Sequence, residues 1–191
     1  MIDKAIDNAY IAIQRLGDDF RKCTAIVAEP LEEPGPGEVL VRHHFVGVNG
    51  VYDQMMCLDR VEHTRVVPPA PTGVEAVGRV EAVGQGVETF AVGDPVATVR
   101  AGTGYRLWQC VPASEVIAVP EIAPWILAIV PSGVSALVAL EQVAELGSDE
   151  IVLITAAAGG LGHILTQLAV RAGNHVIAVC GTREKAAWLT S

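Results

Sequence analysis

The stretch ITAAAGGLGHILTQLA, residues 154–169, contains a glycine-rich turn directly before an apolar segment. Its positions 157–162 read AAGGLG, which matches the pattern G-x-G-x-x-G except that Ala157 replaces the first glycine. Glycines in such a turn let the backbone approach a pyrophosphate, and the N–H groups of a following helix can bind its charge. A tight turn without a ligand would have the same glycines. The candidate phosphate-binding residues are Ala158, Gly159, Gly160, Leu161 and Gly162.

The segments around this turn favour alternating strands and helices. Residues 150–157 form a continuous apolar, β-branched run, which is typical of a buried parallel strand. A helix is expected over 160–173 and a second buried strand over 175–181. Residues 182–189 are expected to form another helix, with Thr182 as its N-cap. This order is the start of a doubly wound parallel sheet.

The end of the second strand indicates which dinucleotide would bind. An acidic residue there would bind the ribose hydroxyls of NAD and repel the 2′-phosphate of NADP. No carboxylate is present at this position, and Gly181 and Thr182 are followed by the basic residues Arg183 and Lys185. These groups would attract the phosphate, so the sequence favours NADPH over NADH. The alternative is a solvated helix start, although basic residues are unfavourable at a helix N-terminus.

The first part of the chain has a different residue pattern. Short valine-rich runs alternate with glycine- and proline-containing turns, which favours an antiparallel barrel or sandwich. The expected strands are 9–16, 23–29, 38–48, 77–84, 94–100 and 108–113. A helix is expected over 125–146, with a possible break at Pro131. We therefore predict an α/β chain with a β-rich domain at 1–123 and a second domain at 124–191.

Composition excludes several classes of partner. The 191 residues include 22 acidic and 13 basic side chains, a net charge of −9, which argues against nucleic acid or anionic lipid as partner. The four cysteines form no CxxC pair, which favours reduced thiols in the cytoplasm. The N-terminus lacks the features of a signal peptide. Prolines and a glycine interrupt the apolar run 123–140, so no membrane span is expected.

Five segments carry a resemblance to a known family: 37–49 (GEVLVRHHFVGVN), 71–97 (PTGVEAVGRVEAVGQGVETFAVGDPVA), 132–141 (SGVSALVALE), 152–162 (VLITAAAGGLG) and 175–189 (HVIAVCGTREKAAWL). The sequence resembles the medium-chain dehydrogenase/reductases, in their zinc-free quinone and enoyl reductase branch, and within it the 15-oxoprostaglandin 13-reductase group. The resemblance implies a GroES-like β-barrel followed by a partial Rossmann domain that binds NAD(P).

The resemblance also bears on zinc. Zinc-dependent members of the family carry Gly-His-Glu where this chain has Gly73, Val74 and Glu75, and valine cannot bind a metal. The adjacent His43 and His44 lie on an expected strand, where their side chains point to opposite faces. No catalytic metal is expected, and a zinc alcohol dehydrogenase is the weakest alternative.

The resemblance implies hydride transfer from NADPH to the β-carbon of an α,β-unsaturated carbonyl, or to a quinone. It places Asn49 in the cleft near the nicotinamide, with Tyr52 close enough to hydrogen-bond the substrate or cofactor. Ser135 keeps a hydroxyl where the family has threonine, and Lys185 matches a lysine of the 2′-phosphate site. Asn49 could instead be a turn residue, and Tyr52 a packed surface aromatic.

The chain departs from the family pattern at several positions. The segment from Asn49 to Asp53 is one residue longer than the usual Asn-x-x-Asp, so the register of Tyr52 and Asp53 is open. Tyr105 keeps an aromatic ring, but Arg106 and Leu107 replace Ala-Glu. Leu161 replaces a hydroxyl residue of the phosphate loop, and Gly181 replaces a serine that holds the 2′-phosphate.

Family members are roughly twice the ~150-residue scale of one domain, so only two strands of the Rossmann sheet are expected here. Such a fragment would expose an apolar sheet face and edge. We therefore expect poor stability of residues 124–191 alone and weak or no NADPH binding, unless a homodimer or a complementing C-terminal chain covers the sheet. The alternative function is a truncated, non-catalytic remnant or binding module of the same family.

Overall fold

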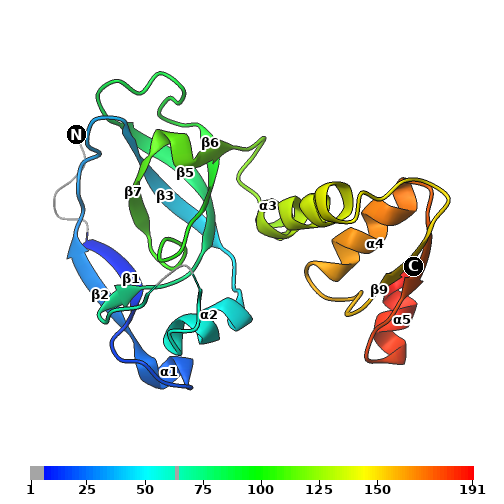
Figure 1. The fold of residues 1–191 in the computed structure, drawn as a ribbon. Coiled ribbons are helices and arrows are strands. Elements are labelled where there is room, and N and C mark those ends of the chain that lie inside the picture. The colour runs from blue at the N-terminus through cyan, green and yellow to red at the C-terminus, as the bar shows by residue number, and fades with distance from the viewer. Residues whose placement is uncertain (1–6, 63–64) are drawn as a thin grey trace. The chain divides into compact units, whose positions relative to one another are not determined.

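The structure is a computed structural model, and it describes residues 7–62 and 65–191. The chain divides into two compact units, Met1–Leu127 and Ala128–Ser191 (Figure 1). The assignment of residues 1–123 and 124–191 to two domains remains a prediction.

The first unit is built from two antiparallel sheets (Figure 1). The larger has the strand order β7-β3-β5-β6-β8, and the smaller has the order β2-β1-β4. The strands are β1 (Asp7–Ile13), β2 (Thr24–Pro30), β3 (Glu38–Val46), β4 (Ala70–Pro71), β5 (Glu75–Val83), β6 (Pro95–Val99), β7 (Trp108–Pro112) and β8 (Val116–Ala118). All six expected strands are confirmed with shifted ends. The two additional strands, β4 and β8, are too short for a periodic signal.

Valine side chains on one face of the larger sheet form the core of this unit. Val39 and Val41 of β3 are two residues apart and therefore point to the same side. They pack with Val80, Val96 and Val111 from the neighbouring strands. The pairing of β3 with β5 shifts register twice along its length. Such irregularities bend a strand and increase its twist, and the sheet curls around the core as a half-barrel (Figure 1).

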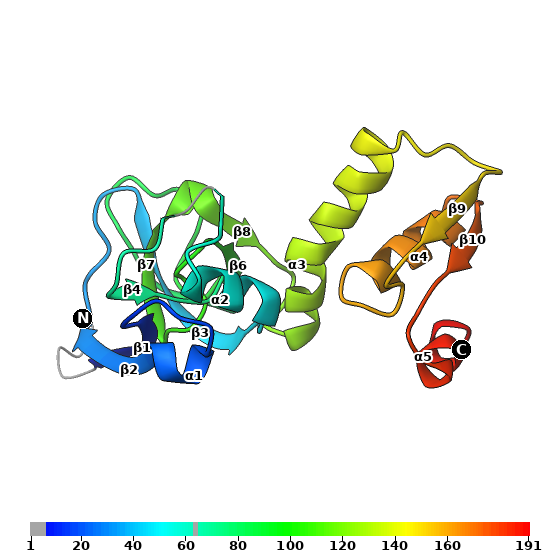
Figure 2. The ribbon, with the colours of Figure 1, turned by 60° about the horizontal axis from the view of Figure 1, so that its bottom comes forward.

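A second core lies beneath two short helices that were not expected from the sequence. These are α1 (Phe20–Cys23) and α2 (Gly50–Cys57), which contact each other (Figure 2). Their buried apolar side chains are Cys23, Met56 and Cys57, which pack with Ile13 of β1. Helices of four and eight residues are too short for helical periodicity to identify them.

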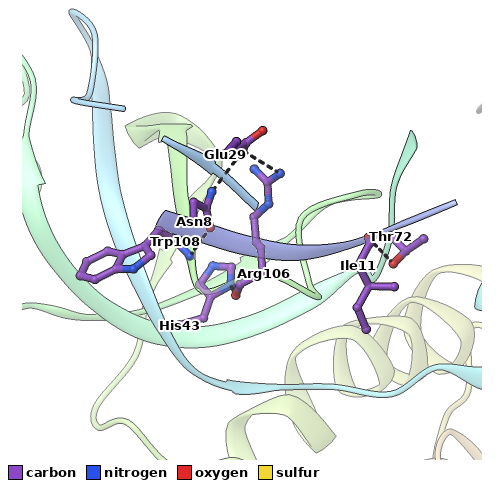
Figure 3. A network of polar contacts seen from close by, with 7 residues as sticks. All are labelled: Asn8, Ile11, Glu29, His43, Thr72, Arg106 and Trp108. Atoms are coloured by element: carbon purple, nitrogen blue, oxygen red, sulfur yellow. Dashed lines mark hydrogen bonds and ion pairs between the residues drawn. The ribbon is translucent and has the colours of Figure 1, made fainter. Parts of the chain in front are cut away.

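A polar network joins the two sheets of this unit (Figure 3). The Asn8 amide donates to Glu29 at 3.2 Å and accepts from the backbone N–H of Trp108 at 3.0 Å. The Arg106 guanidinium lies 3.7 Å from the same Glu29 carboxylate. The carbonyl of Arg106 lies 2.9 Å from Nδ1 of the buried His43. Arg106 therefore helps to join the two sheets, which accounts for an arginine at this position of the sequence.

The second unit has the expected order of alternating strands and helices. A two-stranded parallel sheet pairs β9 (Ile151–Ile154) with β10 (His175–Ala178). Between them lies α4 (Gly162–Arg171), and α5 (Arg183–Leu189) follows β10. The hydroxyl of Thr182 accepts a hydrogen bond from the Lys185 N–H at 3.2 Å, which confirms Thr182 as the N-cap of α5.

The helical stretch before this sheet corrects two expectations. Helix α3 (Pro124–Leu137) continues through Pro131 into the π-helical segment η2 (Val138–Val143), so the expected break is wrong. A proline inside a helix removes one backbone hydrogen bond and costs about 3 kcal/mol of helix stability. The remaining hydrogen bonds of the helix keep it continuous. The resulting stretch Pro124–Val143 has a mean hydropathy of 1.8 and is long and apolar enough to cross a membrane. The core helix of a globular domain meets the same test, so this is weak evidence for a span.

One face of the parallel sheet is uncovered in this unit. Val152, Ile154 and Val176 point toward α4 and pack in one cluster with its Ala169. The alternating side chains of the other face, Ile151, Leu153, Ile177 and Val179, are between 46% and 74% exposed. Parallel sheets are normally covered on both faces. The exposed apolar face expected for a partial sheet is therefore present.

The burial of His43 makes the stability of the first unit depend on pH. Desolvation lowers the pKa of His43 from 6.5 to about 4, against the effect of the Arg106 carbonyl. The unfolded chain therefore binds a proton more readily between these values. The contribution of His43 to the free energy of unfolding is therefore at its maximum above pH 6.5. It falls by up to ~3 kcal/mol as the pH decreases toward 4.

We expect His43→Gln to remove this part of the pH dependence. The free energy of unfolding is measured in denaturant at pH 7 and pH 4.5 for the native chain, His43→Gln and, as control, the exposed neighbour His44→Gln. Carboxyl groups contribute equally to all three proteins and cancel in the comparison. An unchanged difference between the two pH values in His43→Gln would contradict the assignment.

Candidate functional site

A hollow of about 560 Å³ lies in the first unit beside α1 and α2. Its walls are mainly apolar, and its two buried or half-buried polar side chains are Asp53 of α2 and Tyr105. The apolar wall includes Ile11, Phe20, Val46 and Val48. A second hollow of about 370 Å³ shares Ile11, Val46 and Tyr105 with the first, so the two are adjacent. An apolar hollow with few polar groups is the usual form of a small-molecule site.

Asp53 and Tyr105 line this hollow, and the Glu75 carboxyl lies close enough to Asp53 to feel its charge. The Tyr105 hydroxyl donates a hydrogen bond of 2.6 Å to Oδ2 of Asp53. Asp53 and Glu75 are buried, with exposed fractions of 6% and 8%. Among the described residues, neither Oδ1 of Asp53 nor Oε2 of Glu75 has a hydrogen-bond partner. Unpaired oxygens of buried carboxyl groups are unfavourable in the ionised state.

The surroundings of all three groups favour their protonated forms. Burial raises the pKa of Asp53, although the hydrogen bond from Tyr105 acts in the opposite direction. Burial also raises the pKa of Glu75, and the negative charge of Asp53 adds to this effect. The pKa of Tyr105 is raised first by burial and then by its bond to Asp53. Two neighbouring buried carboxyls cannot both ionise cheaply, so the cluster gives up its last carboxyl proton at a higher pH than exposed carboxyls do.

Close backbone packing holds Tyr105 next to Glu75. A Cβ atom on Gly104 would lie 2.6 Å from the backbone nitrogen of Val74, and one on Gly47 would collide with the Glu75 carboxyl. The Phe20 ring meets the Tyr105 ring edge-on at 6.4 Å between centroids. Glycines at these positions thus allow the loop before β7 to lie directly on the start of β5.

The two predicted catalytic residues lie at the start of α2, next to Asp53: Asn49 is the N-cap and Tyr52 is in the first turn. Oδ1 of Asn49 accepts from the Tyr52 N–H at 3.2 Å and caps the helix. Tyr52 is half-buried and packs against the core beneath α1 and α2. Gly50 and Asp53 line the hollow, whereas Asn49 and Tyr52 are not among its lining residues. The catalytic roles of Asn49 and Tyr52 remain predictions.

The glycine turn of the second unit lies between β9 and α4. The Ala157 N–H donates to the Val179 carbonyl at 2.9 Å, and the Gly159 N–H donates to the Ala156 carbonyl at 2.8 Å. A Cβ atom on Gly162 would collide with that Ala156 carbonyl. The first N–H groups of a helix have no partner within it, and the N-cap Leu161 provides no side-chain acceptor. The His163 N–H donates to the Gly159 carbonyl at 3.1 Å, so the turn itself pairs one of these groups.

The predicted 2′-phosphate residues surround the end of β10. A hollow of about 460 Å³ is lined by Gly181, Thr182 and Arg183 among other residues. Lys185 is exposed on the first turn of α5 but does not line this hollow. The Ser135 hydroxyl donates to the Pro131 carbonyl at 2.8 Å within α3. The hydrogen bond from Ala157 to Val179 brings the glycine turn beside this strand end.

Sequence reasoning did not identify the acid cluster as a site. Tyr105 and Asp53 are 52 positions apart, and Glu75 lies in neither segment. In the sequence, the extra residue before Asp53 leaves its register against the family pattern open. Glu75 stands out there only as the neighbour of Val74 at a metal position of the zinc-dependent members. The one usable signal was two acidic residues within otherwise apolar segments, since such residues are rarely buried without a reason.

The described residues contain no group of three His, Cys, Asp or Glu side chains that could hold a metal ion. His43 is buried against the Arg106 carbonyl, whereas His44 is exposed. Their opposite orientation follows from the alternation of a strand.

Comparisons with known proteins agree with this architecture. Residues 35–121 match the family described as Alcohol dehydrogenase GroES-like domain. The chain is 36% identical to Prostaglandin reductase-3 of Mus musculus over 183 residues, covering 95% of this chain and 48% of that protein. It is 35% identical to a Probable quinone oxidoreductase of Leishmania amazonensis, covering 95% of this chain and 53% of that protein.

A solved structure gives a further likeness. Mycobacterial Rv1454c, determined in complex with NADPH, is 31% identical with a TM-score of 0.82, covering 95% of this chain and 56% of that one. The chain thus spans about half the length of the curated relatives it matches. Its first unit contains the GroES-like domain, and the chain belongs to the medium-chain dehydrogenase/reductase superfamily.

Proposed function

We propose that the chain is part of an NADPH-dependent oxidoreductase that reduces the C=C bond of α,β-unsaturated carbonyls, or a quinone, by zinc-independent hydride transfer. The observation that carries the proposal is the turn before α4, where a Cβ atom on Gly162 would collide with the Ala156 carbonyl and the N-cap Leu161 gives the first N–H groups of the helix no side-chain acceptor. Relatives named as reductases and quinone oxidoreductases support the reaction class. Val74, which cannot bind a metal, supports the absence of catalytic zinc.

Each part of the proposed site has a distinct role. The pyrophosphate would lie against the turn formed by Ala158, Gly159, Gly160, Leu161 and Gly162, and the 2′-phosphate near Gly181, Thr182, Arg183 and Lys185. Ser135 would supply a further polar contact. NADPH, when bound, supplies the hydride. Asn49 and Tyr52 would position the nicotinamide or the substrate from the start of α2.

The hollow beside α1 and α2 would receive the enone or quinone. Its apolar wall would exclude water, and its polar cluster is the part able to hydrogen-bond a carbonyl oxygen. The four free cysteines support a reducing compartment such as the cytoplasm.

The uncovered face of the β9–β10 sheet calls for a covering segment. We propose that a C-terminal segment of the kind present in the longer relatives covers it, either continuous with this chain or as a complementing chain. Sedimentation of the chain alone tests the alternative, in which the same face joins two copies. A concentration-dependent homodimer that Leu153→Lys dissociates would favour that alternative.

The same face favours a second candidate function, a non-catalytic remnant or binding module. In this alternative the GroES-like unit folds and persists, while the partial second unit binds no cofactor. The two candidates differ in their response to NADPH.

Fluorescence titration of the native chain with NADPH and NADH separates these candidates. We expect weak binding, tighter for NADPH, and oxidation of bound NADPH on addition of an enone or a quinone. No binding would refute the enzyme function for this chain, and tighter binding of NADH would contradict the role of the basic residues.

Reversal of charge at the 2′-phosphate site tests the cofactor preference. We expect Arg183→Glu combined with Lys185→Glu to weaken NADPH binding about tenfold or more and to leave NADH binding nearly unchanged, since the phosphate alone differs between them. Arg171→Glu, in the exposed last turn of α4, is the matched control. Equal weakening for both dinucleotides would contradict the assignment.

The turn itself is tested by Gly162→Ala. The added methyl group meets the Ala156 carbonyl, so the turn must open. We expect a lower unfolding temperature and at least tenfold weaker NADPH binding. Gly181→Ala has no atom within 4 Å of the added group and serves as the control for stability alone. An unchanged unfolding temperature in Gly162→Ala would show that the turn tolerates a side chain.

A further inference from the structure

We propose that Tyr105 is the proton donor of the reduction and that Asp53 returns a proton to it, within the apolar hollow beside α1 and α2. The inference rests on the proposed reductase function and names two residues of its site that no comparison assigns. It differs from the sequence-based expectation, in which Tyr52 is the tyrosine that hydrogen-bonds the substrate or cofactor.

The geometry favours Tyr105 over Tyr52. Tyr105 lines both adjacent hollows, whereas Tyr52 lines neither. The Tyr105 hydroxyl is 2.6 Å from Oδ2 of Asp53, a distance typical of a strong O–H···O bond. The edge-on Phe20 ring and the glycine-permitted packing of Gly104 hold the Tyr105 ring in place. A fixed donor in an apolar wall is the arrangement required for proton delivery.

Asp53 and Glu75 provide the proton supply. Both carboxyls are buried, and Oδ1 of Asp53 and Oε2 of Glu75 have no partner among the described residues. With a proton on Asp53, that carboxyl can donate to the Tyr105 oxygen, and the Tyr105 hydroxyl proton is then free to point into the hollow. Asp53 and Glu75 of β5 act on Tyr105, and Tyr105 acts on Asp53. Asp53 in turn acts on Glu75 and on the Cys57 thiol of α2.

The proton transfer balances with the hydride. Hydride addition to the β-carbon moves the C=C electron pair toward the carbonyl oxygen and creates an enolate. The Tyr105 O–H bond breaks, and its proton neutralises the enolate. The Asp53 carboxylic proton passes to the tyrosinate, and one proton from solvent restores Asp53. For a quinone, the same proton completes the hydroquinone. One hydride and one proton are consumed in each case.

A phenol tests this site without hydride transfer. 4-Nitrophenol resembles the enolate oxygen, and its absorbance distinguishes the phenol from the phenolate. We expect the native chain to bind the phenolate, and Tyr105→Phe to bind it at least tenfold more weakly. Ser114→Ala removes an exposed hydroxyl of the first unit that lines neither hollow; it is the control and should bind as the native chain does. Equal binding in all three proteins would overturn the proposal.

Asp53→Asn provides a second, independent readout and keeps the Tyr105 hydroxyl. In the native chain, affinity for the phenolate should fall as rising pH removes the proton from Asp53. In Asp53→Asn this fall should shift in pH or vanish, whereas a purely structural role would leave the profile unchanged. An unchanged profile overturns the role of Asp53. Failure of the native chain to oxidise NADPH refutes the proposed function alone, because phenol binding requires no hydride.

Discussion

The backbone hydrogen bonds of the segment 104–107 connect the two sheets of the first unit. The Leu107 N–H donates to the Ala9 carbonyl, and the Leu107 carbonyl accepts from the His43 N–H. The Tyr105 carbonyl accepts from the Ile11 N–H at 2.9 Å. A short segment bonded to both β1 and β3 cannot rotate or slide, since each shift would leave buried backbone groups unpaired. The directions of its side chains follow from this constraint.

Successive residues of this segment consequently serve different purposes. Tyr105 points toward Asp53 and lines the apolar hollow, while Arg106 reaches Glu29 and lies over the Tyr10 ring at 4.9 Å. The buried groups on either side respond to desolvation with opposite signs. Burial lowers the pKa of His43 and so favours its neutral form, and it raises the pKa of Asp53 and Glu75 and so favours their protonated forms. Both effects favour uncharged side chains in the interior beside the apolar hollow.

The second unit follows a different constraint, that of a parallel sheet with one covered face. Helix α4 packs on Val152, Ile154 and Val176, and this packing places the glycine turn at the end of β9. The turn is locally complete because its hydrogen bonds involve only its own residues and the end of β10. The opposite face has no such partner in this unit. A turn with all its hydrogen bonds formed locally and a sheet with only one covered face therefore occur together in about sixty residues.

The sequence alone determined the features that depend on local pattern. Valine alternation predicted the strands of the first unit, and the run EIVLITAA with the turn AAGGLG predicted β9 and the start of α4, because periodicity and glycine placement act over a few neighbouring residues. The N-cap role of Thr182 followed in the same way.

The tertiary structure alone decided what depends on distant residues. The short helices α1 and α2 carry too few turns for a periodic signal, and helix α3 passes through Pro131 because the whole helix outweighs one missing bond. The cluster of Asp53, Glu75 and Tyr105 joins positions from three segments. No local pattern encodes that meeting, since it arises from the pairing of β1, β3 and the segment 104–107, and burial then sets the protonation of the groups it brings together.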